Sequence, residues 1–280
     1  MKARTAILLV VAIPIVAVLV ATPACDLLTR VFGPPDVKLS EQYQKNQDGA
    51  TFDHSRLDAV LHDYVTEDGW VDYARLAKDP GQLDAYIAEI GNADWDALDR
   101  DEKFALLINA YNAFTLRLIL DHWPLASIRD IPSAKRWSDQ RWRVGKLTVS
   151  LESLEHEYLR KRFKDPRMHF AINCASVGCP PLRTEAYTGE KLETQLQAQV
   201  LRVHHSPTRW FQLQKSKVRL TQIYRWFGRD FKQVAGSVLA FAARFSPELA
   251  LRMQQDHPPR IEWLAYDWSI NSIESKARKR

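Results

Sequence analysis

The chain has 280 residues, of which 46% are hydrophobic and 26% charged, so it is long and apolar enough to bury a sizeable core. Its formal charge of +5 comes from the two ends of the chain. Residues 26–275 contain 33 of the 39 basic residues and all 34 acidic residues. A body with a net charge of −1 excludes an extended phosphate-binding surface, so we expect no nucleic-acid partner.

The first 25 residues, MKARTAILLVVAIPIVAVLVATPAC, combine a basic start, an apolar run and small residues before a cysteine. This pattern is typical of a secretory signal peptide. The segment 22–25 resembles a bacterial lipobox, with Thr22 in place of the usual aliphatic residue, and predicts a lipidated Cys25. An uncleaved membrane anchor is the alternative, because the apolar run of about 16 residues is just under the usual spanning length. We therefore expect a protein of the cell envelope, held at the periplasmic side of the inner membrane.

Composition divides the rest of the chain into three parts. Residues 26–51 contain Gly33-Pro34-Pro35 and a polar run, which predicts a flexible tether. Residues 52–272 carry the periodic patterns of a folded domain. The basic residues 273–280 are expected to form a disordered, solvated tail.

The strongest helical pattern covers about residues 101–121, with acidic residues at its start and Pro124 beyond its end. Apolar side chains lie on nearly all of its faces, which predicts a buried helix at the centre of the domain. Asn109 and Asn112 lie three residues apart in it, and their amides need partners once buried. They either bind the backbone of a neighbouring loop, or line a pocket and hold a ligand or a catalytic group.

Shorter elements follow one another along the remaining chain. Helices are expected around residues 57–64, 83–90, 151–160, 189–203, 222–227 and 237–253, hairpins at 141–150 and 209–220, and strands at 168–174 and 261–271. Because helices and hairpins mix without regular β-α-β alternation, we predict an α+β fold with helices packed on a small, mostly antiparallel sheet.

The stretch HFAINCASVGCPPL, residues 169–182, concentrates reactive side chains. In the expected strand, five steps from His169 to Cys174 span about 16 Å and place the two side chains on opposite faces. A nucleophilic Cys174 would therefore take its base from elsewhere, for example from His156 on the preceding helix. Cys179 could fold back towards Cys174, because Gly178 permits a tight turn.

Several interpretations of the two cysteines stay open. They could form a structural or redox disulfide, act through a catalytic thiolate, bind a metal together with the two histidines, or remain unpaired core thiols. Their spacing matches no standard zinc pattern, so we expect no metal and no cofactor. Asp267, near the end of the last strand, either orients a histidine or caps a turn.

Five stretches in chain order, LINAYNAFTLRLIL, SLESLEHEYLR, DPRMHFAINCASVGCPPLRTEAYT, IYRWFGRDF and YDWSIN, resemble the domain of unknown function 547 (DUF547) family over about residues 55–272. The resemblance implies a bacterial envelope domain whose biochemistry is unsettled. It implies characteristic positions at Asn109, Tyr111, Asn112, His156, Arg167, His169, Cys174 and Cys179. The order of long helix, His169 and Asp267 is also similar to papain-like and transglutaminase-like folds, although asparagines stand where those folds place a cysteine.

These observations predict a polar pocket built from the central helix, His169 and the loop of residues 174–179, lined also by Tyr111, Arg167 and Asp267. The sharpest hypothesis is a thiol-dependent hydrolase or acyltransferase with Cys174 as nucleophile and His169 or His156 as base. Thiol–disulfide chemistry is a second. The alternative is a non-catalytic envelope module that binds a small molecule or a protein and is stapled by a Cys174–Cys179 disulfide.

Overall fold

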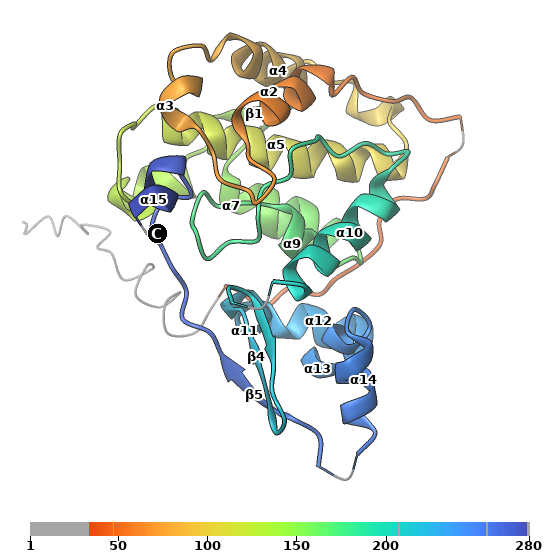
Figure 1. Cartoon of the computed structure of the whole chain (residues 1–280). Helices are drawn as coiled ribbons and strands as arrows, with labels where there is room; N and C mark the ends of the chain where they lie inside the picture. The colour runs from red at the N-terminus through yellow and green to blue at the C-terminus, as the bar shows by residue number, and fades with distance from the viewer. Residues whose placement is uncertain (1–33, 47, 207, 256, 279–280) are drawn as a thin grey trace, which may run out of the picture.

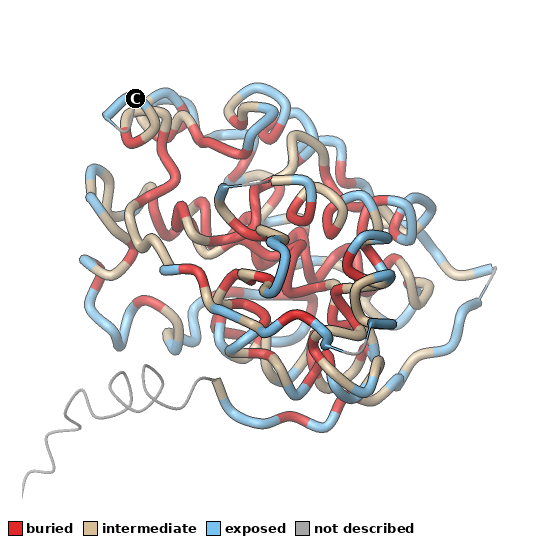
Figure 2. The backbone as a smooth tube through the Cα atoms, turned by 60° about the horizontal axis from the view of Figure 1, so that its bottom comes forward, coloured by how far each residue is buried: buried red, intermediate tan, exposed pale blue. Residues whose placement is uncertain are grey.

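The computed structural model describes residues 34–46, 48–206, 208–255 and 257–278. The predicted leader, residues 1–25, and the first part of the predicted tether lie outside the described residues. Among those described, the fold is α+β, as predicted, with many helices and two small sheets. In Figure 2 the buried segments gather in the interior and the exposed turns lie around them.

Helix α5 (Arg100–Leu120) is the centre of the larger body. It begins where the Asp99 side chain accepts a hydrogen bond from the backbone of Asp101, and acidic residues in the first turn suit its dipole. Of the helices that the structure describes, it alone is long and apolar enough to cross a membrane, but 94% of its apolar window is buried inside the fold. It is therefore the core helix that the sequence predicted.

Helices α2 (Ser55–Tyr64), α3 (Tyr73–Leu76) and α4 (Gly81–Gly91) cover one side of α5 (Figure 1). The predicted hairpin forms as β1 (Trp142–Val144) and β2 (Leu147–Val149), and Gly145 supplies the positive φ of 54° that its turn requires. Ser150 then caps α7 (Leu151–Ser153), as expected, through the backbone nitrogen of Ser153. The helix continues as a π-helical segment, η3 (Leu154–Leu159), and as α8 (Arg160–Arg162).

A second, smaller body follows α10 (Leu192–His204). Strand β3 (Phe211–Leu213) pairs antiparallel with β4 (Lys217–Leu220), which pairs in parallel with β5 (Arg260–Trp263). Helices α11 (Gln222–Trp226), α12 (Gly228–Ala235), α13 (Val238–Ala243) and α14 (Pro247–Met253) pack with this sheet around their own apolar core. Figure 1 shows this body below the α5 body, with an extended segment running back from β5 to α15 (Ile273–Arg278).

The sequence predicted one strand wrongly. Residues 168–174 were expected to be extended, but Met168–Ala171 form one helical turn, α9. Asp165 and Pro166 accept hydrogen bonds from the nitrogens of Met168 and His169 and wind the chain before the expected strand can begin. His169 therefore lies on a helix. The expected similarity to papain-like folds required His169 on a strand, and that strand does not form.

The two predicted disordered segments are packed where the structure describes them. In the predicted tether, Val37 and Leu39 are buried, and their backbones exchange hydrogen bonds with the Gln233 side chain. In the predicted tail, Ile273–Arg278 form α15, and Lys276 pairs with Asp68 at 2.6 Å.

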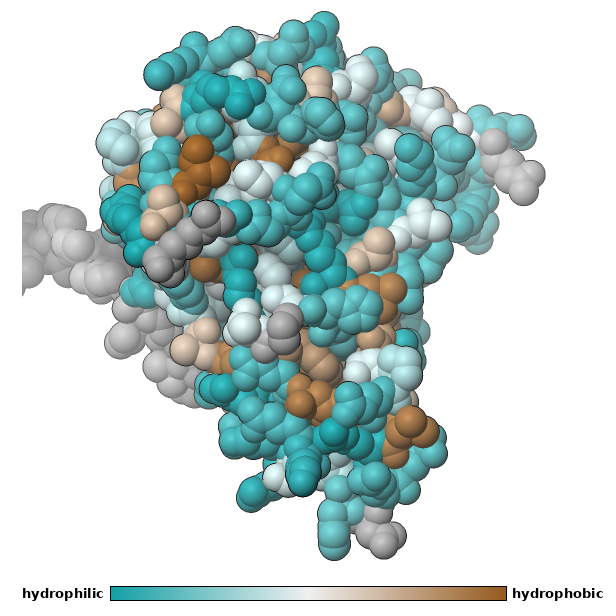
Figure 3. Space-filling view, in the orientation of Figure 1, coloured by the Kyte–Doolittle hydropathy of each residue, from teal (hydrophilic) through white to brown (hydrophobic). Residues whose placement is uncertain are grey.

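The predicted strand over 261–271 is regular only to Trp263, and the chain beyond it makes single bridges. Figure 3 shows a surface that is mainly hydrophilic with scattered hydrophobic residues.

Candidate functional site

The loop between α9 and α10 brings the two cysteines together. The Sγ atoms of Cys174 and Cys179 are 2.8 Å apart and are not joined in a disulfide. The backbone nitrogen of Cys174 also donates to the sulfur of Cys179 at 3.1 Å. Cys179 is buried and Cys174 is partly exposed, so Cys174 is the more accessible of the two residues. The disulfide itself stays a prediction.

Asn173 fixes the shape of this loop. Its side-chain oxygen accepts a hydrogen bond from the nitrogen of Ala175 at 2.8 Å, and its amide donates to the carbonyl of Pro180 at 2.7 Å. Ala175 has a φ of 60°, a strained conformation for a residue other than glycine. The loop is thus held in a defined, partly strained shape around the two sulfurs.

The segment after β5 closes the site from the other side. A Cβ atom on Gly178 would lie 2.8 Å from the nitrogen of Asp267 and 2.9 Å from the ring of Tyr266, so only glycine permits this approach. As a result, the hydroxyl of Tyr266 reaches the sulfur of Cys174 at 3.2 Å and the hydroxyl of Ser176 at 2.8 Å.

These contacts stabilise the thiolate of Cys174. A hydrogen bond from Cys179, assisted by those from Ser176 and Tyr266, lowers the pKa of Cys174 from 9.0 to about 7, although burial opposes the shift. Burial, together with the adjacent Cys174, raises the pKa of Cys179 well above its ordinary value. The thiol of Cys174 therefore ionises before that of Cys179, which stays protonated at neutral pH.

The two predicted bases lie in a buried ionic network. His169 bonds Asp230 through Nε2 at 2.9 Å, and Arg160 pairs with the same carboxylate at 2.7 Å. His156 contacts the guanidinium of Arg160 at 3.2 Å. Burial lowers the pKa of His169 to about 4 and that of His156 to about 3, so both imidazoles are neutral at pH 7. Within the described residues, neither histidine bonds either sulfur.

Glu155 lies between this network and the sulfurs. Its carboxyl is 3.9 Å from Nδ1 of His169, a buried nitrogen without a hydrogen-bond partner. Burial raises the pKa of Glu155 to about 8, and the negative charges of Cys174 and Asp230 add to the effect. Glu155 is in the π-helical segment η3, and such bulges are frequent at functional sites.

Residues 95–202 match the family model described as a protein of unknown function, DUF547. A DUF547 domain is therefore present in this chain. The matched range includes α5, η3, the cysteine loop and most of α10. It is shorter than the range 52–272 that was predicted for the whole domain. No curated protein and no solved structure matched the chain significantly.

The two asparagines of α5 serve different parts of the DUF547 domain. Asn112 accepts from the nitrogen of Asn173 at 2.8 Å and donates to the carbonyl of Ala171, so it positions the start of the cysteine loop. Asn109 instead exchanges two hydrogen bonds with the backbone of Tyr187 and contacts His54. Both amides thus bind neighbouring backbone, and only Asn112 faces the segment that carries the sulfurs.

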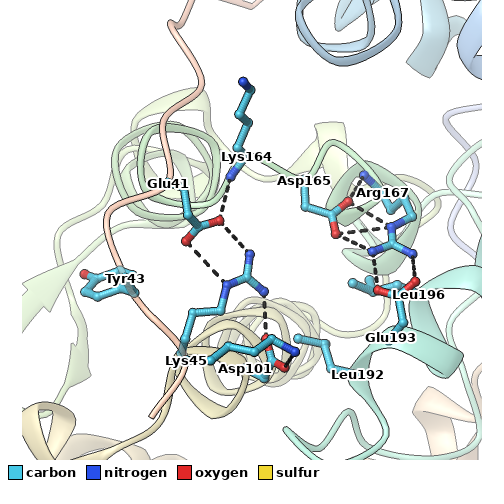
Figure 4. A pocket seen from close by; sticks show the side chains of 11 residues that line it. Glu41, Tyr43, Lys45, Asp101, Lys164, Asp165, Arg167, Leu192, Glu193 and Leu196 are labelled. Atoms are coloured by element: carbon cyan, nitrogen blue, oxygen red, sulfur yellow. Dashed lines mark hydrogen bonds and ion pairs between the residues drawn. The ribbon is translucent and has the colours of Figure 1, made fainter.

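Arg167 lies in a separate hollow of about 370 Å³ between the N-terminal segment, α5 and α10 (Figure 4). Its guanidinium is bidentate to both Asp165 and Glu193. On the other side of the hollow, Arg100 pairs with Glu41 at 2.7 Å. The charges are thus paired with one another, and the structure does not bring Arg167 to the cysteines.

Of the remaining predicted residues, Tyr111 is close enough for the cysteine charges to act on it, and the backbone of Asp267 accepts a hydrogen bond from Gly178 of the cysteine loop. Tyr111 is buried, and burial together with the charges of Glu155 and the cysteines raises its pKa well above its ordinary value. The side chain of Asp267 accepts from the nitrogen of Ser269, which is the predicted turn-capping role. The carboxylate that contacts His169 is Asp230 instead.

Sequence reasoning did not single out Ser176, Tyr266, Glu155, Asp230 or Arg160 for this site. All five lie inside the stretches that resemble the DUF547 family, which was the available signal. Among the described residues, no group of histidine, cysteine and carboxylate side chains is placed to hold a metal ion.

Proposed function

We propose that the protein carries out reversible thiol–disulfide exchange through Cys174 and Cys179. One observation carries the proposal: the sulfurs are 2.8 Å apart, and the more exposed one is hydrogen-bonded as a thiolate. A low pKa on an accessible sulfur beside a buried thiol of high pKa is the arrangement that exchange requires. The reaction partner is a disulfide-bearing substrate in one direction and a dithiol in the other.

The reaction balances in two steps. The thiolate of Cys174 attacks one sulfur of the substrate disulfide, forming a mixed disulfide and releasing the other substrate sulfur as a thiolate. Cys179 then loses its proton to solvent and attacks the sulfur of Cys174. The substrate leaves as a dithiol after taking up two protons. The two electrons that reduce it come from Cys174 and Cys179, which end as a disulfide.

The geometry supports this chemistry better than acyl transfer or hydrolysis. Those reactions need a base within hydrogen-bond reach of the nucleophile. His169 and His156 are bonded to Asp230 and Arg160 instead, whereas the strongest contact of Cys174 is with a second sulfur. Disulfide exchange needs no histidine base. With a pKa of about 7, Cys174 is about half ionised at pH 7.

We also propose that the leader exports the chain and keeps it at the periplasmic side of the inner membrane. In an oxidising compartment disulfides form and persist, so substrates that carry a disulfide are present there. The proposal rests on residues 1–25 of the sequence alone, and expression of a fusion to a periplasm-dependent reporter tests it.

The exchange is tested with Cys25→Ser as the parent protein, so that only Cys174 and Cys179 remain. The parent is equilibrated in graded mixtures of reduced and oxidised glutathione, and free thiols, bridges and glutathione adducts are counted by alkylation and mass measurement. We expect reversible bridging, at a potential above about −300 mV, the range of labile rather than structural disulfides.

Two further variants separate the roles of the sulfurs. Cys179→Ser should accumulate a stable mixed disulfide with a disulfide peptide, because the second step cannot occur. Cys174→Ser should stay unmodified, because the remaining sulfur is buried and its pKa is raised. A bridge that persists under mild reductant, or a pair that never bridges, contradicts the proposal. The first result would favour the non-catalytic envelope module.

A further inference from the structure

A second hollow, of about 620 Å³, opens to solvent beside the cysteine loop. It lies between the turn of η2 (Ile128–Asp130) and the segment that joins β5 to α15. Ser127, Arg129, Asp130, Tyr266, Asp267 and Trp268 line it. The thiol–disulfide chemistry described above uses only one of these residues.

Tyr266 connects this hollow to the reactive sulfur. Its ring lies 4.6 Å from the ring of Trp268 and 4.7 Å from that of Trp226, while its hydroxyl is 3.2 Å from the sulfur of Cys174. All three rings are partly exposed. A molecule that rests on these aromatic rings therefore lies one side chain away from the nucleophile.

The lining of the hollow holds two carboxylates, those of Asp130 and Asp267, and one guanidinium, that of Arg129. The carboxylate of Asp130 accepts from the nitrogens of Ala126 and Ser127, and that of Asp267 accepts from the nitrogen of Ser269. The guanidinium of Arg129 lies 5.4 Å above the ring of Trp268 and makes no ion pair with a described residue. Arg129 is thus the cation of this lining, and its guanidinium can pair with a carboxylate of a bound molecule.

We propose that this hollow docks a polypeptide segment in which an acidic side chain lies close to the reacting disulfide. The inference rests on the proposed exchange function and names its substrate class. An open surface of tryptophan, tyrosine and arginine has the composition of protein-interface hot spots, whereas small molecules are held in more enclosed cavities. The acidic side chain pairs with Arg129, and the chain beside it covers the rings of Trp268 and Tyr266.

The test uses three synthetic peptides that differ at one position, with Glu, Gln or Lys two residues before a single cysteine. Each cysteine is activated as a disulfide with 2-thiopyridine, so that attack by Cys174 releases thiopyridone and its absorbance gives the rate. With the Cys25→Ser parent, the Glu peptide should react about tenfold faster than the Lys peptide, because opposite charges favour encounter and like charges oppose it.

Arg129→Gln should make the three rates equal, whereas Lys146→Gln should leave the preference for Glu intact. The control removes the same charge from the exposed β1–β2 turn, outside the hollow. Trp268→Leu should slow all three peptides alike and leave their ratio unchanged. The uncharged reagent 2,2′-dithiodipyridine should react equally with the parent, Arg129→Gln and Lys146→Gln, which also shows that these variants are folded.

Two results overturn the docking inference while the exchange function stands. They are equal rates for the three peptides in the parent, and a preference for Glu that survives Arg129→Gln, in each case with rapid reaction of the uncharged reagent. If the uncharged reagent itself reacts no faster than with an unfolded thiol, the exchange function fails, and the inference about its substrate fails with it.

Discussion

Replacing Tyr266 by phenylalanine tests how the site activates its thiol. The change removes one hydroxyl that is 3.2 Å from the sulfur of Cys174 and keeps the ring in place. A fall of the Cys174 pKa from 9.0 to about 7 corresponds to roughly 3 kcal/mol in favour of the thiolate. Cys179 supplies the largest part of that stabilisation and Ser176 another part, so the loss of Tyr266 should cost less than about 1 kcal/mol.

A cost of that size raises the pKa of Cys174 by about half a unit. At pH 7 the thiolate fraction then falls about twofold, whereas at pH 10 both proteins are ionised and react at the same rate. The assay is the rate of alkylation of Cys174 by iodoacetamide between pH 5 and pH 10, read by mass spectrometry in the Cys25→Ser parent.

Tyr187→Phe is the matched control, because it removes a tyrosine hydroxyl that is buried and has no hydrogen-bond partner among the described residues. It should leave the profile of Cys174 unchanged. A parent thiol that titrates near 9 would refute the assigned thiolate stabilisation. A Tyr266→Phe profile identical to that of the parent would refute the role of the hydroxyl.

Three further predictions concern the surroundings of the two sulfurs. Asn112→Ala and Asn109→Ala should each destabilise the fold by about 1–3 kcal/mol in urea unfolding, but only Asn112→Ala should alter alkylation of the loop thiol. Equal effects on alkylation would argue against the separation of the two amides. Arg160→Met leaves the Asp230 carboxylate buried without its guanidinium and should cost roughly 3–5 kcal/mol, while adding Asp230→Leu should recover part of the loss. Folding raises the pKa of Glu155 from 4.5 to about 8, so this group opposes folding increasingly as pH rises between these values, by up to about 1.4 kcal/mol per pH unit. Glu155→Gln should therefore gain stability over the parent from pH 5 to pH 8, and parallel stability curves would contradict the assignment.

Local pattern was sufficient for the elements whose residues carry their own signal. Helix α5 was predicted because apolar side chains occupy all its faces over twenty-one residues, which only a buried helix accommodates. The β1–β2 hairpin was predicted from Gly145, and the start of α7 from Ser150, because a positive φ and a side-chain cap are properties of single residues.

Local pattern failed where an element is too short for a period to repeat within it. The four residues of α9 give too few positions to distinguish helix from strand, and their hydrophobic composition favoured a strand. The predicted tail was assigned from charge alone, whereas its start is held by a hydrogen bond to Val71 and by an ion pair between Lys276 and Asp68, about two hundred positions earlier in the sequence.

The sequence by itself determined that two cysteines five positions apart, with Gly178 between them, would share one loop near the central helix. Only the tertiary structure decided which groups act on them. It turned His169 towards Asp230, brought Tyr266 to the sulfur of Cys174, and left Arg129 beside the aromatic rings. The physical reason is that a pKa depends on the donors, charges and burial around a group. Some of these groups, such as Asp230 beside His169 and Tyr266 beside Cys174, come from segments about sixty to ninety residues away, whose packing no local period encodes.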